Sequence, residues 1–190
     1  NSAATGTWLL NVSGTQTAVT YVNVSRSNAS SGSVISSTSN GTNTDCSNNT
    51  NWNFSIPDVP SSLGPSGLVG GVYTNDSTPT PTFTITDSDS GDTVRFQIQF
   101  DDTANFSSVV VDYTSALQAQ GATSFTVGQA AGTGTYTTGS AGQPLTDVSF
   151  YWRARTTDNS SVVSAWTTAN SGNVAFIVDT TTPTVPGIPS

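Results

Sequence analysis

The amino-acid sequence lacks most of the side chains on which enzymes depend. Its 190 residues include no histidine, lysine or glutamate, and only one cysteine. Without histidine or lysine as a base, neither a Ser-His-Asp nor a Cys-His arrangement can be assembled. Zinc and redox centres need several Cys or His ligands, which this chain does not have. The sequence therefore excludes the common nucleophilic and soft-metal chemistries.

Aspartate is the only acidic residue, so pairs of aspartates are the remaining catalytic option. Two carboxylates are sufficient for glycoside hydrolysis. Most aspartates of this chain fall in expected turns or at strand ends, where Asp commonly accepts hydrogen bonds from nearby backbone. We therefore predict that the protein is not an enzyme and needs no cofactor, calcium being the one exception considered below.

The single cysteine, Cys46, cannot form a disulfide within the chain. An odd cysteine in a secreted protein indicates an intermolecular disulfide or a free thiol. A small buried hydrophobic residue is the simpler alternative. The sequence leaves these alternatives open.

Charge is scarce as well. Charged residues make up 8% of the chain, against about 25% in ordinary globular proteins, and the net charge is −8. An acidic chain without clustered Lys and Arg is not expected to bind nucleic acid or anionic membrane. No apolar run reaches about 18 residues, so we expect no membrane insertion. The Ser-, Thr- and Asn-rich surface and the start at Asn1 favour an exported, extracellular or cell-surface protein, although a trimmed chain would look the same.

Helical spacing of apolar residues is also missing, and alternation takes its place. Residues 93–101 and 148–158 alternate apolar and polar side chains over their whole length. Alternation of this kind predicts strands with one buried face. We expect these two strands at the centre of an all-β fold, with Trp152 facing the core.

The chain divides into four parts by composition. We expect a small β-rich domain at 1–58, a linker rich in Pro, Gly and Ser at 59–76, a β-sandwich at 77–182 and an extended tail at 183–190. The linker is either a spacer or a segment pinned to a domain surface by its apolar residues. The tail is either an inter-module linker, a strand that adds to a neighbour's sheet, or a disordered end.

The first of these parts is short of apolar side chains. Trp8, Leu10 and Val12 alternate, which predicts a strand with Trp8 turned inward. Domains of about 60 residues are marginal on their own. We expect this block to be stabilised by packing against the second domain, a neighbouring copy or another part of a longer protein.

Two motifs in the first block carry a family resemblance. Residues 19–29, VTYVNVSRSNA, precede residues 43–54, NTDCSNNTNWNF, with a polar stretch between them. This arrangement resembles the closing segment of parallel β-solenoid regions in large modular bacterial surface proteins. The resemblance implies a structural context and no chemistry.

The second block contains three motifs that carry a further family resemblance. They are DSDSGDTVRFQIQFDD at 87–102, FYWRARTTDNSSVVSAWTTA at 150–169 and VAFIVDTTTP at 174–183. With these motifs the block resembles the fibronectin type III family, in the variety that occurs in tandem on bacterial surface proteins. About seven short strands with frequent turns are also typical of an immunoglobulin-like sandwich. The resemblance covers about half of the chain and implies a fold rather than a ligand.

Two candidate sites remain. Asp87, Asp89 and Asp92 crowd one predicted turn, and calcium prefers several oxygen ligands in a flexible loop. An Asp-rich turn without metal is the alternative. Trp166 is the tryptophan least committed to the core by alternation, which makes it a candidate for stacking against a sugar; the alternative is packing at the sandwich edge.

These features together predict a structural module of a cell-surface stalk or extracellular filament, assembled head to tail from copies of itself. An open-ended contact between unlike surfaces is how such fibres grow. The alternative is an adhesin or carbohydrate-binding accessory module of a larger secreted protein, with glycans as partners.

Overall fold

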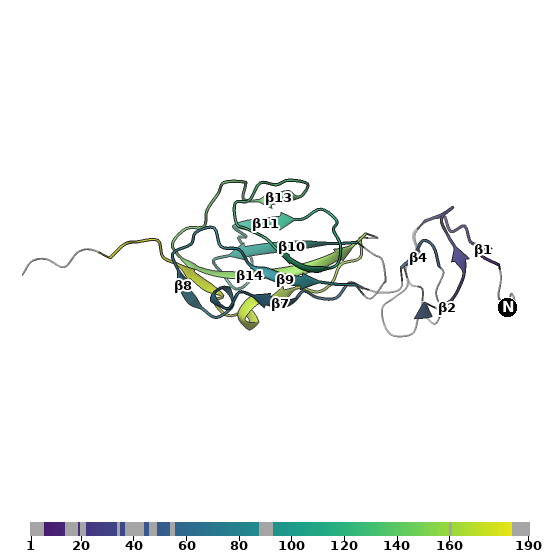
Figure 1. Ribbon diagram of the computed structural model, residues 1–190, viewed down its shortest axis with the longest axis horizontal. Coiled ribbons are helices and arrows are strands. Elements are labelled where there is room, and N and C mark those ends of the chain that lie inside the picture. The colour runs from purple at the N-terminus through teal and green to yellow at the C-terminus, as the bar shows by residue number, and fades with distance from the viewer. Residues whose placement is uncertain are drawn as a thin grey trace, which may run out of the picture.

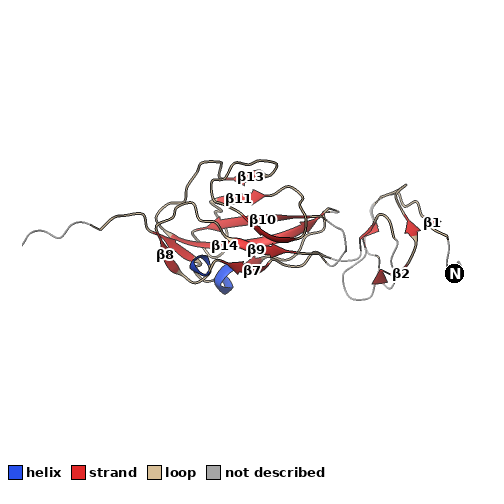
Figure 2. Ribbon diagram, viewed as in Figure 1, coloured by secondary structure: helices blue, strands red, loops and turns tan. Residues whose placement is uncertain are grey.

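The computed structural model is all-β. It describes residues 6–13, 19, 22–33, 35–36, 44–45, 49–53, 56–87, 93–159 and 161–183. Figure 2 shows strands throughout, and the helical elements of this part of the chain are two short 3-10 turns, η1 (Ser66–Leu68) and η2 (Ala169–Gly172). No helix among the described residues is long and apolar enough to cross a membrane.

Two long strands form the centre of the larger sheet. β10 (Val94–Asp101) and β14 (Ser149–Asp158) pair antiparallel from Val94↔Asp158 to Asp101↔Tyr151. Along most of each strand, buried apolar residues alternate with partly exposed polar ones, and Phe100 and Trp152 are fully buried. The two strands predicted from alternation, and the inward direction of Trp152, are confirmed.

Shorter strands complete this sheet on both sides. The strand order is β13-β11-β10-β14-β16-β8, with β15 pairing β14 as well. The added strands are β11 (Val111–Thr114), β13 (Thr135–Thr138), β15 (Thr167–Thr168), β16 (Phe176–Val178) and β8 (Val72–Thr74). β8 pairs β16 in parallel, whereas the other pairs are antiparallel.

A second sheet covers the inner face of the first. It contains β12 (Gly121–Ser124), β9 (Thr82–Ile85) and β7 (Ser61–Gly64) in that order. Phe83 meets Phe96 across the interface, with ring centroids 5.0 Å apart, and also lies 6.2 Å from Trp152. The two sheets thus enclose one aromatic core, an arrangement compatible with a β-sandwich (Figure 1). We call residues 56–183 the two-layer domain.

The segment 59–76 is part of this domain rather than a spacer before it. β7, η1 and β8 all lie within it, and Leu68 is buried in the core. The carbonyl of Leu68 accepts a 2.7 Å hydrogen bond from the indole N–H of Trp152. Gly71 has φ +70 and approaches the Val174 carbonyl so closely that a Cβ would lie 3.3 Å from it. The Pro- and Gly-rich composition therefore reflects tight turns between edge strands.

Residues 6–53 form a separate stack of short strands in parallel pairs, which we call the N-terminal stack. β1 (Trp8–Leu9) pairs β3 (Ser27–Asn28), β2 (Asn23–Val24) pairs β5 (Thr44–Asp45), and β4 (Ile35–Ser36) pairs β6 (Trp52–Asn53). In each pair the partner lies 17 to 21 positions later in the chain. The stack therefore has three layers. At one position these layers are β1, β3 and residue Thr50, which forms a parallel β-bridge with Asn28 of β3.

Two asparagines tie the layers together. The side-chain amide of Asn49 donates to the Val24 carbonyl (2.8 Å), and its oxygen accepts from the Ser27 N–H (2.9 Å). Asn51 donates to the carbonyls of Ala29 and Gly32. These bonds satisfy backbone groups at the bends, where strand pairing cannot reach them.

Trp8 is not buried, although alternation predicts that it faces inward. Its side chain is 43% exposed, and its indole N–H donates to the Ser25 carbonyl. The layers are held by strands of two residues, which are too short for alternation to decide which face is buried. Cys46 and residues 184–190 of the tail lie outside the described residues.

Candidate interaction surfaces

The outer face of the large sheet carries a connected polar network. Arg153 on β14 donates two hydrogen bonds, of 2.9 and 2.7 Å, to the Gln99 side-chain oxygen on β10. Two residues further along β14, Arg155 donates a 2.8 Å hydrogen bond to the side-chain oxygen of Gln97 on β10. Both pairs are direct cross-strand neighbours in the register of β10 with β14. Cross-strand neighbours on one face are close enough to interact in this way.

One carboxylate closes the network on the other side. The amide nitrogens of Gln97 and Gln99 each donate a 2.7 Å bond to a different oxygen of Asp112 on β11. A charge-assisted bond of this kind is stronger than one between neutral groups. Each glutamine thus relays between an arginine and the same acidic side chain, which fixes the orientation of both amides.

Aromatic rings cover the two arginines. The guanidinium carbon of Arg153 lies 4.0 Å from the ring centroid of Phe106 and 4.4 Å from that of Trp166, and that of Arg155 lies 4.5 Å from Trp166. These are cation–π distances. Burial and the positive charge of Arg155 lower the pKa of the Arg153 guanidinium, and the negative charges of Asp112 and Asp101 oppose that shift.

Trp166 therefore has stacking partners from its own chain. The side chain is half-buried and contacts both arginines, so a sugar would have to compete with them for its ring. Alternation placed Arg153, Arg155, Gln97 and Gln99 on the polar faces of their strands. Alternation does not predict the register between β10 and β14, and this register places each arginine opposite a glutamine.

Replacing Trp166 with alanine is expected to lower the free energy of unfolding by about 1–2 kcal/mol, since two cation–π contacts are lost at a half-exposed site. Denaturant unfolding followed by circular dichroism measures this loss. Leu117→Ala on the same domain, also exposed, is a matched control expected to have little effect. Unchanged stability together with lost binding on a glycan array would instead assign Trp166 to a ligand.

A second carboxylate is buried near this face. Asp101, at the end of β10, accepts hydrogen bonds from the N–H groups of Thr103 and Ser108, both at 3.1 Å. Burial by itself raises the pKa of the Asp101 carboxyl, but these hydrogen bonds outweigh burial and hold the pKa below its ordinary value. The charged form is thus favoured in the folded protein.

Acid is therefore expected to weaken the two-layer domain through Asp101. Because the folded pKa lies below the unfolded one, the contribution to stability is complete above about pH 4 and is lost as pH falls through the folded pKa. Asp101→Asn should lower stability at neutral pH and show a shallower loss on acidification. Unfolding measured above and below about pH 4 checks this. An acid dependence equal to that of the parent chain would contradict it.

The calcium prediction stays a prediction. Asp87 follows β9, is buried, and donates its backbone N–H to the Gln120 side chain at 2.8 Å. Asp89 and Asp92 lie outside the described residues. Within the part of the chain that the structure describes, no group of three or more Asp or Cys side chains is placed to hold a metal ion.

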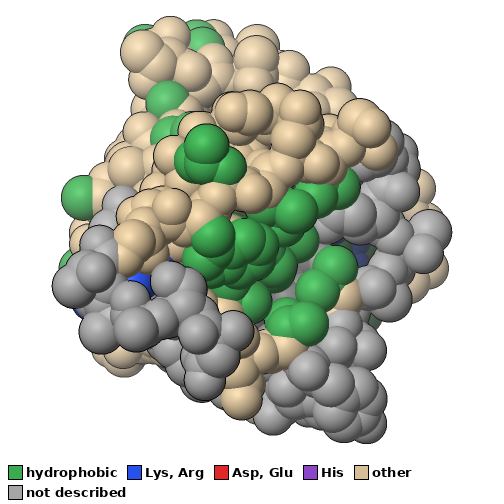
Figure 3. Space-filling model, turned by 90° about the vertical axis from the view of Figure 1, so that its right-hand side faces the viewer, with side chains coloured by type: hydrophobic (Ala, Val, Ile, Leu, Met, Phe, Trp, Pro, Cys, Tyr) green, Lys and Arg blue, Asp and Glu red, His purple; other side chains and the backbone are tan. Residues whose placement is uncertain are grey.

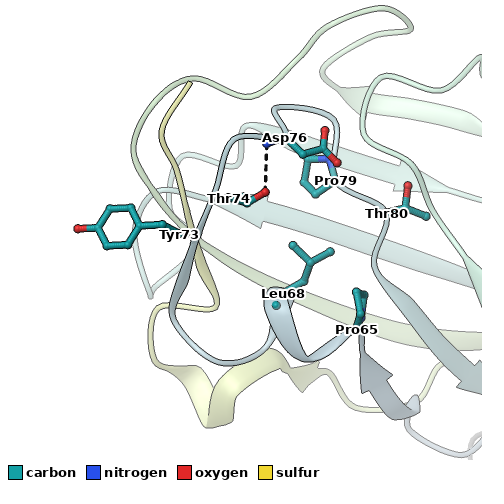
Figure 4. A pocket seen from close by; sticks show the side chains of 8 residues that line it. Pro65, Leu68, Tyr73, Thr74, Asp76, Pro79 and Thr80 are labelled. Atoms are coloured by element: carbon teal, nitrogen blue, oxygen red, sulfur yellow. Dashed lines mark hydrogen bonds between the residues drawn. The ribbon is translucent and has the colours of Figure 1, made fainter. Parts of the chain in front are cut away.

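An open pocket of about 380 Å³ lies at the β8 end of the two-layer domain (Figure 4). Pro65, Leu68 and Pro79 give it an apolar wall, whereas the Tyr73 side chain points away from it. The one carboxylate in its lining, Asp76, accepts bonds from the N–H and hydroxyl of Thr78. The pocket can receive a small apolar group, but its charged group is already engaged.

Comparisons with protein families, with characterised proteins and with solved structures gave no match.

Proposed function

We propose that the chain is a non-enzymatic structural module of an extracellular stalk or filament, in which such modules follow one another head to tail. The path of the chain is the observation that carries this proposal. The N-terminal stack lies beyond one end of the two-layer domain, and the segment that follows β16 leaves the domain at the opposite end (Figure 1). A chain that passes from end to end adds length along one axis, which is what a spacer does.

Strand pairing along this path supports a load-bearing role. β7 is the first strand of the two-layer domain and pairs β9, β8 follows it, and β16 is the last strand that the structure describes. β8 and β16 pair in parallel over Val72–Thr74 and Phe176–Val178. Once β7 has separated from β9, a pull on the two ends draws these parallel strands past each other. All hydrogen bonds between them are then loaded together, which resists extension better than breaking them one by one.

The strand order supports a fibronectin type III-like fold for the two-layer domain. The sheet β12-β9-β7 faces the strands β11-β10-β14-β16, a distribution similar to the three-against-four sheets of that family. β13 and β8 add to the edges of the larger sheet. We propose in the same way that the N-terminal stack is the end of a β-solenoid, because its layers repeat in parallel at 17 to 22 positions.

An extracellular or cell-surface location fits the low charge content of 8% and the Ser-, Thr- and Asn-rich surface. The partners of each module are other copies of the chain, which follow one another head to tail along the axis of the stalk or filament. The alternative of an adhesin or carbohydrate-binding module keeps Trp166 as its contact residue. The Trp166→Ala comparison above separates that role from the structural one.

Immunogold electron microscopy of cells that produce the chain tests the proposal. With antibodies raised against the two-layer domain, we expect gold particles along thin surface projections at regular intervals. Label found only in soluble secreted material, with none on the cell surface, would contradict a stalk or filament role.

A further inference from the structure

Among the described residues, the far end of the N-terminal stack has a strand, β1, that is paired on one side only. β1 is the outermost strand that the structure describes there. The N–H groups of Trp8 and Leu10 donate to the carbonyls of Arg26 and Asn28, in the second layer, at 3.0 and 2.9 Å. Because backbone groups of successive strand residues point to opposite sides, the N–H and carbonyl of Leu9 point away from that layer.

The same end exposes apolar surface. The side chains of Leu9 and Trp8 are 78% and 43% exposed, whereas Val24, Ala29 and Ile35 in the deeper layers are buried. Figure 3 looks onto this end of the molecule and shows hydrophobic side chains gathered in a hollow, with no acidic side chain among the described atoms around it. Apolar side chains of the described residues are thus exposed at this end, where their burial would stabilise a partner.

The geometry of the stack selects the partner. Each layer already present pairs with the next in parallel, at offsets of 17 to 22 positions. A further layer at the same offset would form backbone hydrogen bonds with Leu9, in the same way that the second layer does with Trp8. It would also cover the hollow. A second copy meeting this end through a two-fold axis would run antiparallel to β1, against the direction of every pair in the stack.

We propose that the open end of the N-terminal stack docks one further solenoid layer, a strand that runs parallel to β1 and belongs to the module on its N-terminal side. The layer hydrogen-bonds the outward N–H and carbonyl of Leu9, and its side chains stack against those of Leu9 and Trp8 on the two faces of the strand. This inference deepens the proposed function, because it names the partner of the same structural module at its N-terminal end.

The test adds a layer to the full chain. A tandem copy of residues 8–26 placed directly before Trp8 reproduces the offset of 19 between Trp8 and Ser27. The matched control carries the same 19 residues in scrambled order. Hydrogen exchange of individual amides is followed by NMR at low protein concentration. We expect the Leu9 amide to exchange at least about tenfold more slowly with the true copy than with the scrambled one, while the already bonded amides of Trp8 and Leu10 change little.

A second variant distinguishes specific docking of the added layer from nonspecific contact. Leu9→Asp in the unextended chain should leave exchange in the stack unchanged, since the side chain is exposed; in the extended chain it should abolish the added protection of β1. Equal Leu9 exchange with the true and scrambled copies overturns the inference. Concentration-dependent protection of Leu9 in the unextended chain would assign the end to a second copy, which overturns this inference while leaving the stalk or filament role intact.

Discussion

Replacing Trp152 with alanine is expected to lower the free energy of unfolding of the two-layer domain by about 5 kcal/mol. The fully buried indole lies against Phe83 and Phe100, and truncation of such a side chain costs about 3–5 kcal/mol. The Leu68 carbonyl also loses its 2.7 Å hydrogen bond, which adds about 1–3 kcal/mol when the group stays buried. Since domain stabilities are about 5–15 kcal/mol, the variant should be near the limit of folding.

Trp152→Phe is the matched control for this prediction. It keeps an aromatic ring in the core and removes the indole N–H, so about 1–3 kcal/mol should be lost. Denaturant unfolding followed by circular dichroism measures both variants. A loss below about 1 kcal/mol for alanine, which is typical of surface positions, would mean that Trp152 and the docked segment 59–76 do not hold the two sheets together.

The second large effect is expected at Asn49 in the N-terminal stack. Asn49→Ala removes two hydrogen bonds, to the Val24 carbonyl and from the Ser27 N–H. Leaving these partly buried groups without partners costs about 2–3 kcal/mol. A block of about 50 residues has little stability to lose, so the stack should unfold while the two-layer domain stays folded.

Hydrogen exchange measures this prediction separately for the two parts of the chain. The amides of Ser27 and Ala29 should exchange rapidly in Asn49→Ala, and those of β10 and β14 should not change. Asn28→Ala is the control, because its side chain accepts only a local bond from the Ser30 N–H at an exposed site. Equal protection of the stack in both variants would show that the Asn49 bridge does not hold the layers.

The sequence predicts the core of this protein better than its edges. β10 and β14 are long enough for alternation to define which face is buried, and the structure confirms both. Residues 59–76 failed as a spacer prediction because tight turns and spacers share the same Pro, Gly and Ser composition. What distinguishes them is the contact between Leu68 and Trp152, 84 positions apart, which local composition does not encode.

The surface features show the same limit. Trp166 was identified as uncommitted, but its stacking on Arg153 and Arg155 depends on how β14 and the segment after it return over the sheet. Trp8 is exposed, contrary to the expected burial, because it lies in the outermost described layer of the stack, which alternation within one strand does not reveal. Parallel pairing at about 20 positions likewise leaves no alternation signal, since each layer contributes only short strands with polar bends.

Single-molecule pulling of the full chain tests most directly whether this protein is built to bear load along its axis. With handles at both ends, the parent two-layer domain should unfold in one step, and Asp179→Pro should unfold at clearly lower force, because it removes the N–H that donates to the Thr74 carbonyl beside the β8–β16 pair. Asp147→Ala, which removes only the exposed bonds to Thr180, should unfold like the parent. Gradual extension of the parent without a force peak, or equal unfolding forces for Asp179→Pro and the parent, would contradict the structural role.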